Sequence, residues 1–333
     1  MKCLCALCLL LVSLLLRSEG YRCGDGGQCH SEVLDSKQLE TAFHDFMKAY
    51  NKTYKDQAET IRRFKIFVEN MERARKLQEA ERGTAKYGVT KFSDLSADDF
   101  KSGMLESPDK HLCSPLNSVN GVGKIPDMVD WRKNHSVTPV KDQGDCRSCW
   151  AFAVVGNVES QWSIKNKVLI SLSDQEVLDC TTAGNCSGGH IDLAFHDVIK
   201  LGGLMTEDSY SYAGKVGTCR FKNDKVVAKV KSCVSIAHDE TVMKKYVALN
   251  GTITTILNLG GLQHYKSGIL RSDKPPKYKY HAALIVGYGT ELGTPYWTVK
   301  NSWGTNWGEK GYLRVYRGKN THGIKDFPMS VVV

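Results

Sequence analysis

Two kinds of hydrophobic pattern divide the chain. In residues 36–80, aromatic and aliphatic side chains recur at three- and four-residue steps between charged residues, which is typical of amphipathic helices. Beyond Lys229, runs rich in Val, Ile, Thr and Tyr are separated by glycine-rich turns. This second pattern predicts strands near 252–258, 282–289, 295–303 and 311–318.

Two further helices are predicted between these regions. A mostly apolar segment that begins at Cys149, "CWAFAVVGNVESQWSIKN", is typical of one long helix. A second helix begins after Ser173, which can form a capping box with Glu176. The chain from about Ile125 is therefore helix-rich first and strand-rich second, which predicts an α+β body with a cleft between its halves.

Two segments differ from this folded body. Residues 1–20 contain one early lysine and an apolar run to Leu16 that is too short to span a bilayer comfortably. We interpret them as a secretory signal peptide cleaved near Gly20, not as a membrane anchor. Residues 102–123 are rich in Ser, Pro, Gly and Asn with little periodicity, which indicates a linker accessible to proteolysis.

Composition and charge narrow the class of protein. The length of 333 residues is enough for one large or two ordinary domains. A composition of 41% hydrophobic and 24% charged residues is typical of a globular protein. The net charge of +9 is spread along the chain, so a solvated basic face is favoured over a nucleic-acid partner. Export implies an oxidising compartment. The chain has four N-glycosylation sequons, at Asn51, Asn134, Asn185 and Asn250.

The number and spacing of the cysteines indicate an unpaired or reactive thiol. Of the 12 in the chain, nine follow the signal segment, so at least one is unpaired or reactive. In "KDQGDCRSCWAF", Cys146 and Cys149 could be a redox pair, half of a metal site, or a bridge cysteine beside a nucleophile. The region lacks the βαβ pattern of a redox motif, and no second ligand pair stands at zinc spacing. We therefore expect no metal and no cofactor.

The third alternative separates the roles of the two cysteines. Cys149 would open the long helix, where backbone N–H groups and the helix dipole stabilise a thiolate. A thiolate nucleophile needs a base, and the base needs a group that orients it. His281 stands before one predicted strand and Asn301 ends the next, so the two side chains could lie side by side.

The ordered blocks "QGDCRSCWAF", "CSGGH", "HAALIVGYG" and "NSWGTNWGEKGY" resemble those of the papain-like cysteine peptidases, from about Ile125 onward. The upstream region is similar to the inhibitory proregion of the cathepsin L and F type. It matches at Glu59, Arg63, Phe67, Asn70, Gly88, Phe92 and Asp94, and departs at Ala74, Gln78 and Thr90. The resemblance implies a two-lobed fold, with a helical left lobe, an antiparallel β-barrel right lobe and a helical propeptide whose tail blocks the cleft.

The resemblance also implies a role for each residue of the site. Cys149 would be the nucleophile and His281 the base and then the acid. Asn301 would orient the imidazole, shielded by Trp303. Gln143 would donate to the oxyanion beside the backbone N–H of Cys149. The implied reaction is peptide-bond hydrolysis through a thioester.

The resemblance pairs Cys146 with Cys186 and Cys180 with Cys219. A third family bridge would join the position of Cys233 to a cysteine near the C-terminus, but His322 stands there. We therefore expect Cys233 to be a free thiol or to pair irregularly. Cys23 and Cys29 could pair locally, which leaves Cys113 over.

Substrate-binding residues follow from the same resemblance. The backbone of Gly188 and Gly189 would hold the substrate strand. The main specificity pocket would be lined by His190, Ile256 and Ala282, with Phe327 at its far end. We expect a shallow pocket that prefers medium aliphatic side chains.

Arg147 stands where the family usually has glycine, beside the substrate path. A left-handed backbone there would strain a non-glycine residue. Three alternatives are open: Arg147 recruits acidic substrate residues and favours the Cys149 thiolate, it points into solvent with modest effect, or it obstructs the cleft.

These observations predict a signal peptide (1–20), an inhibitory propeptide (21–124) and a peptidase domain (125–333). The expected function is that of a secreted or lysosomal cysteine peptidase made as a zymogen. No occluding insertion is found near "CSGGHIDLAF", so endopeptidase activity is expected over dipeptide trimming. Its expected partners are protein or peptide substrates, its own propeptide and cystatin-like inhibitors, and the expected state is a monomer. The alternative is a catalytically weakened relative that acts as a secreted binding protein.

Overall fold

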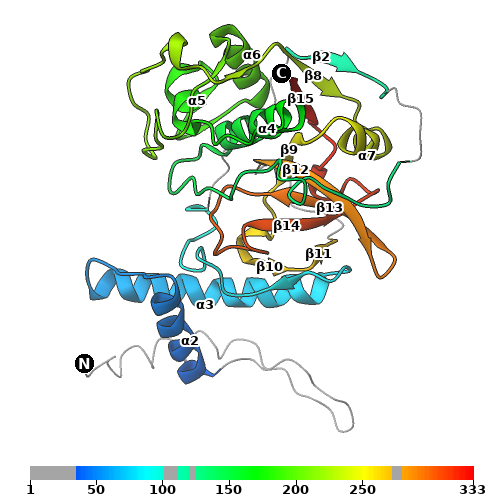
Figure 1. The fold of residues 1–333 in the computed structure, drawn as a ribbon. Helices are drawn as coiled ribbons and strands as arrows, with labels where there is room; N and C mark the ends of the chain where they lie inside the picture. Colours follow the sequence, from blue (N-terminus) through cyan, green and yellow to red (C-terminus); the bar gives the residue numbers. More distant parts are fainter. Residues whose placement is uncertain (1–34, 101–111, 120–124, 272–279) are drawn as a thin grey trace.

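The computed structural model describes residues 35–100, 112–119, 125–271 and 280–333 (Figure 1). The predicted signal peptide and the Cys23–Cys29 pairing lie outside these residues. Helices α4 to α6 gather at one end of the molecule, the large sheet lies in the middle, and helix α3 crosses the far end (Figure 1). None of the described helices is long and apolar enough to cross a membrane.

The first predicted helical region forms two helices, α2 (Ser36–Ala49) and α3 (Gln57–Ala80). Asp35 begins α2 through a capping box with Gln38. The aromatic faces of the two helices pack together: the ring of Phe43 lies 5.3 Å from that of Phe64 and 5.4 Å from that of Phe67. These residues form a small core of their own, separate from the two cores of the remaining chain.

Three helices build the helical lobe: α4 (Cys149–Asn166), α5 (Asp174–Cys180) and α6 (Ile191–Leu201). Helix α4 is buried on nearly all sides because it lies between the other helices and the sheet. Ser173 caps α5 by accepting the N–H of Glu176, which is one arm of the predicted capping box. Two short ladders complete this lobe, β4 (Gly184–Asn185) with β5 (Gly188–Gly189) and β6 (Gly203–Leu204) with β7 (Ala228–Lys229).

The strand lobe is one nine-stranded sheet in the order β11-β14-β13-β12-β9-β15-β8-β2, with β3 paired to β12. The strands are β2 (Ser114–Leu116), β3 (Val129–Asp130), β8 (Ser232–Ile236), β9 (Ile253–Asn258), β11 (Ile269–Leu270), β12 (Tyr280–Glu291), β13 (Thr294–Lys300), β14 (Tyr312–Tyr316) and β15 (Met329–Val332). Helix α7 (Glu240–Leu249) packs on β12. Three 3₁₀ turns span Asn223–Lys225, Leu262–His264 and Thr321–Gly323.

The four predicted strands are confirmed as β9, β12, β13 and β14, but the sheet differs from the expected antiparallel barrel. Within the described residues it does not close, because its end strands β11 and β2 have two and three residues and do not pair with each other. Both end strands also run parallel to their neighbours. Helices α6 and α7 and the short strands β2, β8 and β15 were not predicted from the sequence.

Three disulfides are present in the described chain: Cys146–Cys186, Cys180–Cys219 and Cys113–Cys233. The first two are the pairs that the family resemblance implies. The expectation of a free thiol at Cys233 is wrong, and the irregular pairing is the correct alternative. Cys149 is the free cysteine of the described residues.

Candidate active site

The free thiol lies where the two lobes meet. Cys149 is the first residue of α4 and is fully buried. Its Sγ accepts the backbone N–H of Ala282 at 3.5 Å, across the boundary between α4 and strand β12. His281 is the residue directly before Ala282. The register of β12 therefore brings the imidazole-bearing residue to the start of α4.

Asn301 and Trp303 hold the imidazole. The Nε2 of His281 lies 2.6 Å from the Oδ1 of Asn301, which follows β13, the neighbour of β12. The Trp303 ring lies 4.5 Å from the imidazole ring and leaves little of this pair exposed. The buried Nδ2 of Asn301 has no partner among the described residues. This arrangement fixes the imidazole plane.

Gln143 is fixed by four hydrogen bonds, one of them from the Tyr212 hydroxyl to its carbonyl at 2.9 Å. Its backbone N–H donates to the carbonyl of Ser302 at 2.9 Å, and its Oε1 accepts from the Ser302 hydroxyl at 2.6 Å. Its Nε2 donates to the carbonyl of Cys146 at 3.0 Å. Because a primary amide carries two N–H groups, the second remains available as a donor beside the start of α4.

Burial sets the ionisation of the pair. It raises the pKa of the Cys149 thiol to about 12, against the opposing effect of the Ala282 and Trp150 N–H groups. It lowers the pKa of His281 to about 4, against the opposing hydrogen bond to Asn301. At neutral pH the pair is therefore a neutral thiol and a neutral imidazole. The helix start alone does not keep Cys149 ionised in this buried state.

The proregion reaches the site through aromatic and basic side chains. The rings of Phe92 and Phe100 lie 5.1 Å and 5.4 Å from that of Trp303. The Lys91 ammonium lies 2.6 Å from a carboxylate oxygen of Asp142 and donates to the carbonyl of Trp303 at 2.9 Å. The segment that would continue into the cleft, 101–111, lies outside the described residues.

The proregion also pairs with the sheet lobe at β1 (Lys86–Tyr87), which lies antiparallel to β10 (Tyr265–Ser267). Gln78, a departure from the family pattern, supports this strand. Its amide donates to the carbonyl of Ala85 and accepts the N–H of Tyr87, both at 3.1 Å. Here Gln78 therefore serves the docking of the proregion.

The matching residues of the proregion also bond to one another. Arg63 pairs with Glu59 at 2.7 Å and donates to the carbonyl of Asp94 at 2.9 Å. The buried Asn70 amide donates to the carbonyls of Ser93 and Leu95. Helix α3 thereby fixes the loop that carries Phe92 to Trp303.

The proposed pocket residues lie near one core. Ile256 and Ala282 belong to the core of the helical lobe, and the half-buried Phe327 packs against it. His190 precedes α6 and is half-buried. A Cβ at Gly189 would lie 2.6 Å from the Trp150 ring, so glycine there is required for packing inside the protein. Gly188 has a φ of 134°, which also favours glycine.

Arg147 does not show the backbone strain considered above. Its φ is not in the left-handed region, where seven non-glycine residues of the described chain do lie. Its backbone N–H donates to the carbonyl of Cys186 at 3.2 Å, beside the Cys146–Cys186 bridge. The side chain is half-buried. Arginine therefore fits this position without backbone strain.

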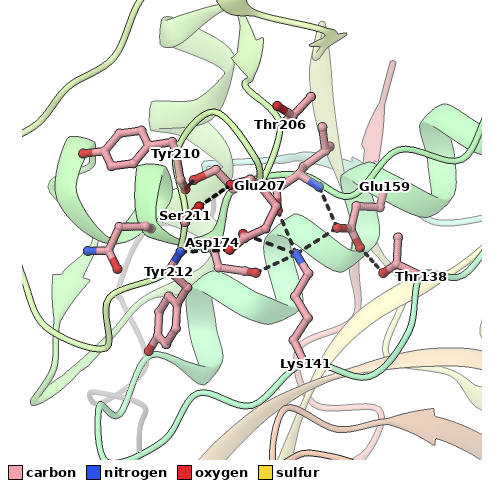
Figure 2. A network of polar contacts seen from close by, with 12 residues as sticks. Thr138, Lys141, Glu159, Asp174, Thr206, Glu207, Tyr210, Ser211 and Tyr212 are labelled. Atoms are coloured by element: carbon pink, nitrogen blue, oxygen red, sulfur yellow. Dashed lines mark hydrogen bonds and ion pairs between the residues drawn. The ribbon is translucent and has the colours of Figure 1, made fainter.

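A buried ionic cluster around Lys141 lies behind the site (Figure 2). It was not predicted from the sequence. The Lys141 ammonium lies 2.7 Å from a carboxylate oxygen of Asp174 and 3.1 Å from one of Glu159, and donates to the carbonyl of Leu172 at 2.7 Å. Burial tends to lower the pKa of Lys141, but the two carboxylates outweigh it and raise that pKa. The sequence feature that could have indicated this cluster is the presence of charged residues within apolar segments.

A small cavity of about 20 Å³ separates this ionic cluster from Asn301 and Ser302. Within the described part of the chain, no group of three His, Cys, Asp or Glu side chains could hold a metal ion.

Comparisons with known proteins identify the family. The family model described as papain family cysteine protease matches residues 125–332, and the cathepsin propeptide inhibitor domain matches residues 43–100. The chain belongs to the papain family of cysteine proteases. This protease is 42% identical over 306 residues to mouse cathepsin F, a match that covers 90% of this chain and 66% of the mouse protein. It is 36% identical to mouse cathepsin W, with 89% of this chain and 87% of that protein covered.

Solved proenzymes have the same fold. The digestive procathepsin L2 proteinase of Tenebrio molitor larval midgut superposes with a TM-score of 0.82 at 30% identity, covering 89% of this chain and all of that one. The recombinant stem bromelain precursor gives 0.78 at 32% identity, covering 89% and 99% of the two chains. This protein is therefore a cysteine-type endopeptidase that carries its own propeptide inhibitor domain.

Proposed function

We propose that Cys149, His281, Asn301 and Gln143 carry out the peptidase reaction. The observation that carries this proposal is the Ala282 N–H bond to the free Cys149 thiol. It puts His281, itself bonded to Asn301, beside the only unpaired cysteine of the described residues. The Gln143 amide is bonded to the carbonyl of Cys146, three residues before Cys149.

The reaction follows from these positions. His281 takes the thiol proton as Sγ attacks the peptide carbonyl carbon. The second N–H of Gln143 and the backbone N–H of Cys149 stabilise the resulting oxyanion. Protonated His281 gives its proton to the leaving amine, which leaves a thioester on Cys149. Water then attacks the thioester with His281 as base, releasing the carboxylic acid and the free thiol.

We further propose that burial of Cys149 and His281 keeps the proenzyme inactive. With thiol and imidazole both neutral and covered, no thiolate is available. Removing the propeptide would admit water and reduce the desolvation that holds the two pKa values apart. We propose that acidification triggers this step, that cleavage occurs near Ile125, and that residues 1–20 and 21–124 are the signal peptide and propeptide. The residue ranges of the two family models support a boundary between residues 100 and 125.

The test is active-site labelling. After exposure to acid and loss of the propeptide, an electrophilic thiol probe should modify Cys149 in wild type and leave Cys149→Ala unmodified. We expect peptide hydrolysis to fall on the order of 10⁶-fold in this variant. Complete propeptide removal without labelling would overturn the enzyme assignment and favour a binding role.

Location, oligomeric state and inhibition complete the proposal. The signal-like N-terminus supports delivery to the secretory pathway, either to a lysosome or outside the cell. We also propose that the mature protease is a monomer and that cystatin-like inhibitors occupy the same cleft. Light scattering would test the monomeric state. Protection of Cys149 from the probe by a cystatin would test the inhibition.

We further propose a shallow specificity pocket lined by His190, Ile256, Ala282 and Phe327, with Arg147 beside the substrate path. A peptide library should show a preference for medium aliphatic residues at the second position before the scissile bond. A strong preference for Phe there would contradict this pocket. Arg147→Gly should reduce the rate on acidic substrates relative to neutral ones, and unchanged selectivity would remove the recruiting role of Arg147.

A further inference from the structure

Residues 113–119 belong physically to the sheet lobe. Cys113 is bonded to Cys233 across 120 residues of sequence. The next three residues form β2, which lies parallel to β8, and the carbonyl of Leu116 accepts the N–H of Ala237 at 2.9 Å. Val119 is buried in the core of the sheet lobe. One covalent bond, one strand pairing and one buried side chain thus attach this segment.

The helical prodomain is attached differently. Among the described residues, its contacts with the peptidase domain include the β1–β10 ladder, hydrogen bonds, the Lys91–Asp142 ion pair, the aromatic contacts of Trp303, and Ala85, which is buried in the same core as Val119. All of these contacts are non-covalent, so none of them holds the helical prodomain once the chain is cut. The proposed cleavage near Ile125 lies on the C-terminal side of Cys113, so both attachments belong to the predicted propeptide but only one is covalent.

We propose that the segment around Cys113 stays with the peptidase domain when the helical prodomain leaves. Two hydrolyses produce this state: one near Ile125, and one between Phe100 and Cys113, within the linker predicted from the sequence, which frees the helical prodomain. The mature protease then carries the segment between the two cuts as a short second chain, joined by the Cys113–Cys233 disulfide. This inference rests on the proposed zymogen processing. Peptide-bond hydrolysis leaves a disulfide intact, because breaking it requires attack by an external thiolate and two reducing equivalents.

Two further observations favour retention. The sulfur-bearing residues are 4% and 5% exposed, so an attacking thiolate has little access to either. In addition, β2 covers the outer edge of β8, whose backbone groups would otherwise be unpaired. Retaining the segment therefore keeps the sheet edge protected in the mature protease.

The experiment compares non-reduced and reduced mature protease. Free thiols are blocked first, and the intact mass is measured with and without reductant. Reduction should release one short peptide that contains Cys113. In a non-reduced tryptic digest of the proenzyme, residues 111–124 and 232–244 should appear as one cross-linked species. The Cys180–Cys219 bridge is an internal control, because its reduction releases no peptide.

A pair of variants isolates the disulfide. After activation and gel filtration, Cys113→Ser/Cys233→Ser should have lost the segment. The matched control Cys23→Ser/Cys29→Ser changes two cysteines of the same proregion and should retain it. If Cys113→Ser/Cys233→Ser folds poorly, the disulfide maps of the wild-type protein still test the proposal. For a chain that does not process itself, pepsin supplies the cut and the same masses are measured.

The outcomes separate this inference from the proposed function. A protease that is labelled at Cys149 but lacks residues 113–119, with Cys233 alkylated before reduction, would overturn the inference and leave the enzyme intact. A single chain that begins before Cys113 and loses no mass on reduction would overturn the two-chain product. Absence of Cys149 labelling after propeptide removal would instead count against the proposed function.

Discussion

Helix α4 carries two polar clusters that differ in how completely their groups are bonded. At its start, the Cys149 site leaves the Nδ2 of Asn301 without a partner among the described residues and keeps thiol and imidazole neutral. Further along, the Lys141 ammonium meets three acceptors, one for each of its N–H groups. A saturated buried cluster stabilises one conformation, whereas the unsaturated one keeps groups available for a reacting molecule.

The largest effect on folding is expected from breaking the saturated cluster. Lys141→Met leaves the buried carboxylates of Asp174 and Glu159 without their cation. We expect a loss of about 3–5 kcal/mol in the free energy of unfolding, measured by chemical denaturation. The loss should be smaller at acidic pH, where protonation neutralises the carboxylates. Lys76→Met, in an exposed ion pair with Glu72, should change stability by less than about 1 kcal/mol.

Lys141→Met should leave activity per folded molecule almost unchanged, because Lys141 touches none of the four residues proposed for catalysis. A loss of activity without a loss of stability would show that the two clusters are not separable in this way.

In the Cys149 site, a substitution should reduce the rate of peptide hydrolysis, whereas Lys141→Met reduces stability. Gln143→Ala removes a proposed oxyanion donor, so kcat/KM for peptide hydrolysis should fall about 10²–10³-fold, or about 3–4 kcal/mol of barrier. Alkylation of Cys149 by iodoacetamide forms no oxyanion, so its rate should change only a few-fold. An equal loss in both rates would mean that Gln143 positions the thiol and does not stabilise the transition state.

A smaller effect on stability is expected at Glu176, a buried carboxyl group without a cation beside it in the described part of the chain. Burial raises the pKa of Glu176 to about 7, although its carboxylate accepts the N–H of Met205 at 2.8 Å. A raised pKa means that the folded state binds the proton more tightly. This stability is present below the ordinary value of 4.5 and is lost as the pH rises through about 7.

Glu176→Gln keeps this position neutral at every pH. Unfolding midpoints measured between pH 4.5 and 8 should therefore vary less, with a gain of up to about 3 kcal/mol at the upper end. The exposed Glu69→Gln serves as the control and should leave the profile of wild type. An unchanged profile in Glu176→Gln would show that another group carries the pH dependence.

The two clusters also differ in how far the sequence predicts them. Cys149, His281 and Asn301 were found because helix and strand boundaries put a thiol, an imidazole and an amide at element ends, in an order that resembles a known family. Lys141 and Glu159 are 18 residues apart and share no motif. Their contact depends on how α4 packs in three dimensions, which no local pattern encodes.

The same limit applies to the fold. Long elements such as α4 and β12 follow from periodicity. Short β2 and β15 depend on pairing with β8, far along the chain, and were missed. The Cys113–Cys233 bridge belongs to this class, because a distant strand pairing brings the two residues together.

The position of Trp303 should make its fluorescence sensitive to activation. Its indole contacts the imidazole of His281 and the rings of Phe92 and Phe100 of the proregion, and it is only 5% exposed. Departure of the proregion would transfer one face of this indole from aromatic rings to water. Activation would then shift the protein's own ultraviolet emission to longer wavelength, and release of the inhibitor could be followed in real time without any label.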